Sequence, residues 1–230
     1  MFQKWQEQLS GCRLFQTMLA NELVLMLDCL KPKLSGFSKN DLITIAGEQF
    51  GGIGIVLSGS VVVTKENLAG NRVIMDILGP GELFGEMVAF SKHNVWPATI
   101  VAQNSCEVLF IPPEKIVGGC GNLCVAHRQL TVNMLRIVSD KAWALHRKVE
   151  YLALGSLREK ISRFLLEQYR TTGKPLFMLP LNRNELAEFL NTTRPSLSRE
   201  FCRMRDEGLI EFHRSSIRIK DIQTLSALLE

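Results

Sequence analysis

The hydrophobic positions along the chain change their spacing near residue 120. Between about Lys33 and Pro113, short apolar runs rich in Val and Ile alternate with Gly, Pro and Asn, as in "GIGIVLSGSVVV" and "LGPGE". Further runs, "RVIMDIL", "PATIVAQ" and "CEVLFIP", recur at the spacing of strands in a β-sandwich or roll. A helical pattern, "NELVLMLDCL", precedes them. The pattern predicts an N-terminal β-roll domain over residues 1–119, with a helix packed against it.

A helical period replaces the strand period after residue 120. Apolar residues then recur at alternating steps of three and four, the spacing of a coiled-coil seam: Leu135, Val138, Ala142, Leu145, Val149 and Leu152. A second apolar line on the same helix is expected to face the roll: Leu130, Met134, Ile137 and Ala144. A helix with two apolar faces needs two partners. Residues 120–154 are therefore predicted to form the dimerisation helix and hinge of a homodimer; burial of this helix within one chain is the alternative.

Two helix starts mark the third part of the chain, residues 155–230. Ser156 and Glu159 have the spacing of a capping box, in which Ser caps the helix and Glu reaches back from the third helical position. A second start, at Asn182 and Glu185, opens the run "ELAEFL". Gly155 lies between the dimerisation helix and the first of these starts, and we predict that it is a hinge between domains.

The stretch "NELAEFLNTTRPSLSREFCRMRDEGLIEF" predicts a helix-turn-helix. Thr193 is expected to cap the second helix, and Pro195 fits its first turn because the N–H that Pro lacks is unpaired there anyway. One helix face is apolar, with Leu197, Phe201 and Met204, and the opposite face is polar. Gly208 ends this helix, and "LIEFHRSSIRIKD" predicts a hairpin around Ser215 and Ser216, the wing of a winged helix-turn-helix.

The polar face of that helix has the chemistry of a DNA reader. An Arg side chain can donate two hydrogen bonds to guanine, which is worth about 1–3 kcal/mol of discrimination between bases. Ser side chains and a wing Arg can hold phosphates and set the register. The predicted DNA-binding residues are Arg194, Pro195, Ser196, Ser198, Arg199 and Arg214. A helical hairpin that only packs is the alternative interpretation.

The charge distribution agrees with a DNA-binding C-terminal half. Residues 1–119 carry 9 Lys and Arg against 11 Asp and Glu, whereas residues 120–150 carry 5 against 2 and residues 151–230 carry 13 against 10. The whole chain has a net charge of +4. Positive charge thus gathers where the helix-turn-helix is predicted, as a nucleic-acid footprint requires. A solvated Arg-rich surface would give the same distribution, so charge alone does not decide the function.

Composition and targeting signals indicate a cytoplasmic globular protein. Hydrophobic residues make up 46% of the chain and charged residues 22%, which is ordinary for a folded domain. The longest apolar run is broken by Gly and Ser and is too short for a membrane span. The N-terminus shows no secretory signal, so the six Cys are expected to be reduced thiols.

One stretch of the predicted roll, "GELFGEMVAFSKHNVWPATI", is a candidate ligand pocket. Gly81 and Gly85 allow the backbone to approach a guest, and Glu82 and Glu86 could hold a hydroxyl group. The predicted effector pocket consists of Gly85, Glu86, Met87, Trp96, Pro97, Leu145 and His146, with Trp143 as a further candidate. A cavity with such aromatic edges suits a small organic effector. The alternative is a vestigial pocket that Trp96 and Pro97 simply fill.

The whole chain resembles the CRP/FNR family of bacterial transcription regulators. "GELFGEM" is similar to the family's roll signature, "CEVLFIP" to its last roll strand and "TRPSLSRE" to its recognition helix. The long helical stretch resembles the linker helix of a subgroup common in anaerobic Gram-positive bacteria. The resemblance implies an α+β fold: an N-terminal double-stranded jelly roll, a long dimerisation helix and a C-terminal winged helix-turn-helix. It also places Arg194, Pro195, Ser198 and Arg199 at base-reading positions.

The same resemblance argues against a cyclic-nucleotide effector. In members that bind cyclic nucleotides, Gly85 and Glu86 correspond to ribose-facing positions, and an Arg-Ser pair holds the phosphate. Trp96 and Pro97 stand in place of that pair and offer no charged fork to a phosphate. Positions that bond the purine correspond to Leu145 and His146. Many members carry Glu where this chain has Pro195, so their operator sequence does not carry over.

Cysteine and histidine patterns predict no metal or cluster. Cys120, Cys124 and His127 have ligand-like spacings, but three candidates at helical spacing form at best a partial site. An iron–sulfur cluster of the FNR type needs an N-terminal run of Cys, and only Cys12 and Cys29 occur there. A haem ligand stays open, because one His or Cys would suffice. Oxidation of Cys202 on the DNA face, with Cys12 as a disulfide partner, is a further hypothesis beside the plain half-buried thiol.

The sequence predicts a regulator and not an enzyme. Metal oxygenases built on β-rolls need His and carboxylate pairs, and only His93 falls within the predicted roll. No nucleophile elbow, Walker loop or dinucleotide fingerprint occurs. The expected partners are double-stranded DNA with a near-palindromic operator, an unidentified small-molecule effector, a second copy of the chain and, for an activator, RNA polymerase. The alternatives are a cyclic-nucleotide-dependent regulator and a ligand-binding module whose C-terminal domain docks a protein.

Overall fold

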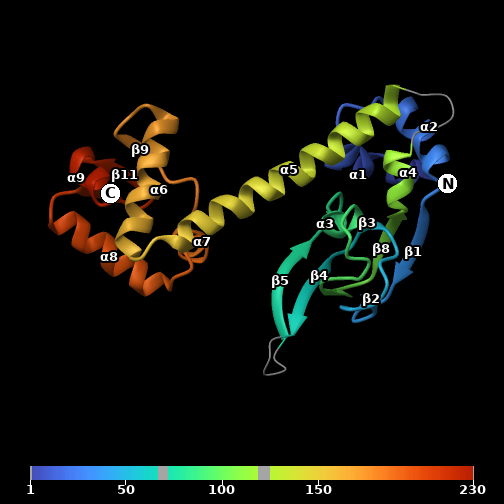
Figure 1. The fold of residues 1–230 in the computed structure, drawn as a ribbon, viewed down its shortest axis with the longest axis horizontal. Coiled ribbons are helices and arrows are strands. Elements are labelled where there is room, and N and C mark those ends of the chain that lie inside the picture. Colours follow the sequence, from blue (N-terminus) through green and yellow to red (C-terminus); the bar gives the residue numbers. More distant parts are fainter. Residues whose placement is uncertain (1, 67–71, 119–124, 230) are drawn as a thin grey trace. The chain divides into compact units, whose positions relative to one another are not determined.

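The structure is a computed structural model that describes residues 2–66, 72–118 and 125–229 (Figure 1). Its internal contacts form two compact units, Met1–Lys141 and Ala142–Glu230, and each unit has its own hydrophobic core. The sequence predicted three parts, with boundaries at residues 119/120 and 154/155. The first of these boundaries lies outside the described residues. The two compact units meet within the long helix, between Lys141 and Ala142, and the three-part division stays a prediction.

The first unit contains the predicted β-roll, built from two four-stranded antiparallel sheets. One sheet has the order β1 (Lys33–Phe37), β8 (Cys106–Ile111), β3 (Ile53–Ser58) and β6 (Leu83–Phe84). The other has the order β2 (Leu42–Thr44), β7 (Thr99–Ala102), β4 (Val61–Glu66) and β5 (Arg72–Leu78). The run "RVIMDIL" coincides with β5, so the strand prediction is confirmed there. The short helix α3 (Glu86–Ala89) follows β6 and was not foreseen.

Helices cover the first sheet of the roll. They are η1 (Phe2–Trp5), α1 (Gln6–Gly11), η2 (Arg13–Phe15), α2 (Ala20–Leu30), α4 (Pro113–Val117) and the first part of α5 (Val125–Ala153) (Figure 1). Leu130, Met134 and Ile137 of α5 are buried in this core, as expected of the second apolar line. Ala144, the last residue of that line, belongs to the second unit and is exposed, and its contact with the roll stays a prediction.

The second unit is the predicted winged helix-turn-helix. It consists of the end of α5, α6 (Leu157–Thr172), β9 (Leu176–Met178), α7 (Arg183–Phe189), α8 (Arg194–Asp206), β10 (Ile210–His213), β11 (Ser216–Ile219) and α9 (Ile222–Ala227). The three strands form an antiparallel sheet in the order β10-β11-β9. The hairpin turns at Arg214 and Ser215, one residue earlier than predicted, since Ser216 already pairs with His213.

Ion pairs connect α5 and α6 across Gly155. Arg147 Nη2 lies 2.6 Å from Glu167 Oε2, and the buried Tyr151 donates a hydrogen bond to the same oxygen over 2.8 Å. Burial and the neighbouring carboxylate raise the pKa of Tyr151 well above its usual range. The Ser156 cap also forms as predicted, its hydroxyl accepting from the Glu159 N–H. The predicted hinge at Gly155 is thus spanned by bonds between the helices on its two sides.

Candidate nucleic-acid interface and effector site

The helix-turn-helix begins with two well-formed caps. Asn182 Oδ1 accepts hydrogen bonds from the backbone N–H of Asn184 (2.9 Å) and of Glu185 (3.0 Å), and the Glu185 carboxylate accepts one from Asn182 N–H (2.7 Å). After α7, Asn191 adopts a left-handed backbone with φ of 53°, a conformation that Asn tolerates well. Thr193 then caps α8 by accepting from the Ser196 N–H. Both predicted helix starts are confirmed.

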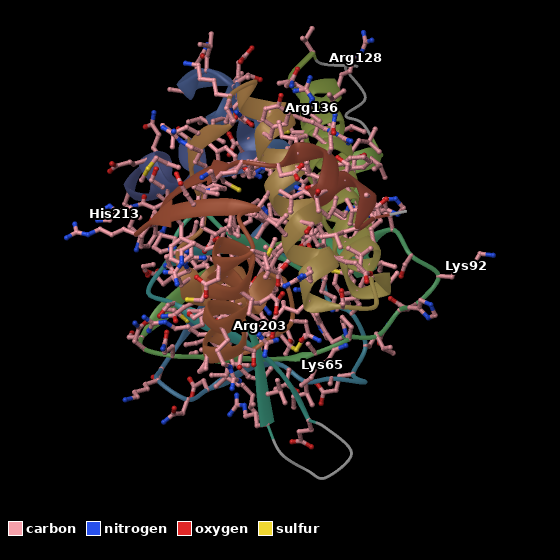
Figure 2. The ribbon with its side chains drawn as sticks, turned by 90° about the vertical axis from the view of Figure 1, so that its left-hand side faces the viewer. Lys65, Lys92, Arg128, Arg136, Arg203 and His213 are labelled. Carbon is pink, nitrogen blue, oxygen red and sulfur yellow. The ribbon has the colours of Figure 1, made fainter. Side chains whose placement is uncertain are left out.

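Helix α8 separates its apolar and polar faces as the sequence predicted. Leu197, Phe201 and Met204 are buried in the core of the second unit. The side chains of Arg194, Pro195, Ser198 and Arg199 are exposed; Arg203 also projects from this helix (Figure 2). Exposed Arg and Ser on the N-terminal half of a second helix are what a major-groove reader presents.

Ser196 differs from its four neighbours on the predicted reading surface. Its side chain is half-buried, and its hydroxyl accepts hydrogen bonds from Thr193 Oγ1 (2.9 Å) and Arg199 Nη2 (3.3 Å). Because both contacts are local, Ser196 helps to shape the helix start and to orient Arg199. Its hydroxyl is therefore less available to a phosphate than the exposed hydroxyl of Ser198.

The wing brings one further cation next to the start of α8. Arg214, at the hairpin turn, has a left-handed backbone with φ of 55°. The side chains between wing, α7 and α8 line a hollow of about 460 Å³: Asn182, Arg183, Asn184, Arg194, Phe212, Arg214 and Ser215. Sequence reasoning named Arg194 and Arg214 separately, and the fold brings them together. Three guanidinium groups with amide and hydroxyl donors suit an anionic phosphate.

Arg183 is the residue of this hollow that sequence reasoning missed. Its guanidinium carbon lies 3.8 Å from the ring centre of Phe201 and 5.2 Å from that of Phe212. Burial lowers the pKa of Arg183 from its usual value, yet an Arg stays charged. The available signal was an Arg at the first position of α7 together with aromatic residues on α8 and β10.

Arg158 fixes the recognition helix to α6. Its Nε lies 2.6 Å from Glu200 Oε1, and its two terminal nitrogens bond both carboxylate oxygens of Glu207 over 2.7 Å. These contacts raise the pKa of Arg158 and lower the pKa of Glu207. A guanidinium bonded to α8 at Glu200 and to Glu207, the residue that follows its end, restricts how this helix can rotate, so Arg158 fixes α8 relative to α6.

The first unit contains the other candidate site, a hollow of about 310 Å³ in the roll. Gly85, Glu86, Met87, Trp96 and Pro97 all line it, so these five predicted pocket residues come together. Two observations show why position 85 requires glycine. Its φ is +88°, and a Cβ on it would lie 3.0 Å from atoms of Trp96 and Phe50. Leu145, His146 and Trp143 belong to the second unit and are exposed, and their part in the pocket stays a prediction.

Trp96 forms a wall of this hollow and is also part of the roll core. Its side chain is buried, with ring centres 4.6 Å from Phe50 and 6.0 Å from Phe84. The indole therefore packs in the core of the roll while a hollow remains beside it, and its correspondence to a phosphate-holding position stays a prediction. The lining of this hollow within the described residues includes Lys65 and Lys141 and no Arg.

The predicted seam of α5 is exposed in the single chain. Leu135 is 62% exposed, and Val138, Ala142, Leu145, Val149 and Leu152 are exposed as well. This excludes, for those positions, the alternative of a helix buried on all sides within one chain. A row of exposed apolar side chains at coiled-coil spacing needs another surface to cover it.

The structure bears on two hypotheses about cysteine, a partial metal site and a disulfide between Cys12 and Cys202. Cys120 and Cys124 lie outside the described residues, whereas His127 is buried and its Nε2 donates to the Lys115 carbonyl over 2.7 Å. Cys12 is fully buried, and burial raises its pKa to about 11, so it presents no accessible thiolate for the proposed disulfide. Cys202 is half-buried on α8. The described residues hold no group of three or more His, Cys, Asp or Glu suited to a metal ion.

Comparisons with known proteins match both parts of the chain. Residues 35–119 match the family described as the cyclic nucleotide-binding domain, and residues 159–228 match the Crp-like helix-turn-helix domain. None of the helices in the described ranges is both long and apolar enough to cross a membrane.

The relatives are transcriptional regulators. The chain is 26% identical over 223 residues to the Cyclic AMP receptor protein of Thermus thermophilus, covering 96% of this chain and 97% of the relative. It is 27% identical over 195 residues to the Transcriptional activator protein FnrA of Stutzerimonas stutzeri, covering 83% and 78%. The crystal structure of the Thermus thermophilus Catabolite Activator Protein matches with a TM-score of 0.55 at 22% identity, over 94% of this chain and 98% of that chain, which shows the shared fold.

Proposed function

The chain belongs to the CRP/FNR family of DNA-binding transcription regulators, and from this premise we propose that it acts as an effector-responsive homodimer on a near-palindromic operator. The observation that carries this proposal is the exposed row of Arg194, Ser198 and Arg199 on α8 beside the Arg-lined hollow of the wing. Two such surfaces, related by the two-fold axis of a dimer, would enter successive major grooves about 34 Å apart.

The homodimer is proposed from the exposed seam of α5. Leu145 is 59% exposed and lies near the middle of the seam, and Val149, one turn further along the same helix, is 56% exposed. In a parallel pair of helices these positions would bury each other. The regulator would act in the cytoplasm, and as an activator it would contact RNA polymerase.

The proposed effector is a small organic molecule and not a cyclic nucleotide. The matched domain family is described as cyclic nucleotide-binding, and one relative is a Cyclic AMP receptor protein, so cyclic AMP is the competing candidate. Against it stand the buried Trp96 and the exposed Pro97, which by resemblance replace the pair that holds the phosphate. The described cations of the lining are Lys65 and Lys141. A phosphate without an Arg fork would forgo the strongest bidentate contact.

Selection of random duplex DNA on the purified, reduced protein tests the proposal. We expect enrichment of a two-fold-symmetric site and an affinity that falls steeply with salt. Addition of cyclic AMP should leave the affinity unchanged. Enrichment of no site, with and without cyclic AMP, would favour a protein-docking C-terminal domain, and a rise in affinity with cyclic AMP would support the competing candidate.

A further inference from the structure

The centre of the outward face of α8 is occupied by a residue whose side chain cannot form a hydrogen bond. Pro195, the second residue of α8, is exposed, and the helical period of about 3.6 residues per turn places it opposite the buried Leu197 and Met204. Its ring carries no donor or acceptor, and its backbone lacks an N–H. Because the N-terminal residues of a recognition helix contact base edges, Pro195 brings an apolar surface to the bases.

The other exposed residues at the start of α8 all carry hydrogen-bond donors. Arg194 and Arg199 end in guanidinium groups, and Ser198 ends in a hydroxyl group. A guanidinium group can pair with the two acceptors that guanine presents in the major groove, O6 and N7. Among the exposed side chains of residues 194–199, Pro195 alone is purely apolar. The face therefore combines donors that suit guanine with one apolar ring.

The same part of α8 exposes no carboxylate and no carboxamide, and the structure describes all of residues 194–200. Their single acidic side chain, Glu200, is buried. Its Oε1 lies 2.6 Å from Nε of Arg158, and its Oε2 lies 3.4 Å from Nη1 of Arg203. Carboxylates identify cytosine and carboxamides identify adenine in the major groove. The start of α8 therefore lacks the side chains that would single out those two bases.

The four bases differ in what they present to an apolar ring. Cytosine presents an amino group, adenine an amino group and a ring nitrogen, and guanine two acceptors, whereas thymine presents a C5-methyl group beside its O4 acceptor. A polar edge held against the ring of Pro195 would lose water without gaining a hydrogen bond, which costs free energy. A methyl group held there buries apolar surface, and the Pro ring has almost no side-chain entropy to lose.

We propose that Pro195 selects thymine, by packing its ring against the C5-methyl group of that base in each half-site of the operator. This inference rests on the proposed function and deepens it, because it names one base that the operator must contain. Together with Arg194 and Arg199, Pro195 makes guanine and thymine the bases that the start of α8 reads directly.

Uracil tests the methyl group, because it pairs as thymine does and lacks only the C5-methyl. Each thymine of the selected operator is replaced by uracil in turn, at the same position of both half-sites, and fluorescence anisotropy measures the affinity of the full-length protein. At one position, uracil should weaken binding about fourfold for each methyl group removed. A half-site selected without thymine, or an operator in which no thymine responds to the replacement, would overturn the proposal.

5-Methylcytosine separates the methyl group from the pairing of the base. At the responding position, replacement of the thymine–adenine pair by a cytosine–guanine pair should weaken binding. Methylation of that cytosine at C5 should then recover about fourfold in affinity for each half-site, because it returns the methyl group alone. An affinity that is the same for cytosine and 5-methylcytosine would contradict recognition of the methyl group.

Variants assign the preference to Pro195. In Pro195→Gly, which removes the ring at an exposed position, operators with thymine and with uracil should bind equally. Ser198→Ala, at an exposed position on the same face, is the matched control and should keep the fourfold preference. A preference that survives Pro195→Gly would refute the assignment. Circular dichroism checks that the variants fold, and Pro195→Ser provides the same comparison if Pro195→Gly does not fold.

The same measurements separate this inference from the proposed function. A protein that binds a two-fold-symmetric operator and does not distinguish thymine from uracil overturns the role of Pro195 and leaves the regulator standing. A protein that selects no operator, with and without cyclic AMP, overturns both.

Discussion

The two hollows of this molecule differ in how far their charged groups are exposed to solvent. In the wing hollow, the guanidinium groups of Arg194 and Arg214 stand at an exposed surface, and Arg183 is held beside them by aromatic rings. In the roll hollow, the buried carboxylate of Glu86 is paired with Lys141, and apolar side chains surround it. The first arrangement favours a large polyanion from outside, and the second favours a small neutral guest.

The residues that line the two hollows also differ in how much they contribute to the stability of the fold. Trp96 is 5% exposed and belongs to the core of the roll, whereas Arg194 and Arg214 are exposed and contribute little to any core. Substitutions in the roll hollow should therefore change folding and ligand binding together. Substitutions of Arg194 or Arg214 in the wing hollow should change DNA binding alone.

The largest expected effect is that of Trp96→Ala. Loss of a buried Trp leaves a cavity, and we expect the roll to lose about 3–5 kcal/mol of unfolding free energy. Effector-dependent DNA binding should disappear with it. Denaturant unfolding followed by circular dichroism measures the loss, with Trp143→Ala, at a position that is 66% exposed, as the matched control. An unaltered stability would mean that Trp96 is not the core residue that its burial indicates.

The next effect in size concerns base reading by Arg194. Arg194→Ala should weaken operator binding by about 1–3 kcal/mol and relax the preference at one base pair, while the unfolding free energy stays the same. Fluorescence anisotropy with the selected operator and with variants of each base pair measures both quantities. Arg170→Ala, at an exposed position at the end of α6, is the control and should change neither. A uniform loss over all sequences would instead assign Arg194 to a phosphate.

A smaller effect is expected for Arg183. Arg183→Met keeps an apolar stem between Phe201 and Phe212 and removes the charge. If Arg183 neutralises one phosphate, its loss should make the negative slope of log affinity against log salt shallower by about 0.9. The loss of affinity should be the same for all DNA sequences. Anisotropy over a series of salt concentrations measures the slope, and Arg183→Lys should retain it. An unchanged slope would leave Arg183 with a packing role only.

The smallest effect is the pH dependence of the winged helix-turn-helix. Arg158 lowers the pKa of Glu207, and Lys220 lowers the pKa of Glu211. A carboxyl group whose pKa is lower in the folded state stabilises the fold above its unfolded pKa of about 4.3, and this contribution is lost as the pH falls through the lowered value. Stability should therefore decline below about pH 4, less steeply in Arg158→Met than in the unaltered protein. Equal slopes in thermal unfolding would contradict this.

Much of the fold and of the DNA-reading surface followed from the sequence because the signals were local. The caps at Asn182 and Thr193 depend on residues two or three positions away, and the exposure of Arg194 and Arg199 follows from helical period. Prediction was weaker where a residue's neighbours come from other elements. The hairpin turn, for example, was placed one residue late.

The sequence by itself determined the order of the parts and the helix starts, and it predicted which residues of α5 and α8 are exposed, since each depends on spacing along the chain. Only the tertiary structure decided that Arg183 joins Arg194 and Arg214 and that Lys141 meets Glu86, a partner 55 positions away. Such contacts depend on how sheets and helices pack, and the spacing of residues along the chain does not predict them. The same pattern of residues could have left the Glu86 carboxylate in solvent, and the fold instead buries it, with one oxygen paired with Lys141 and the other without a hydrogen-bond partner among the described residues.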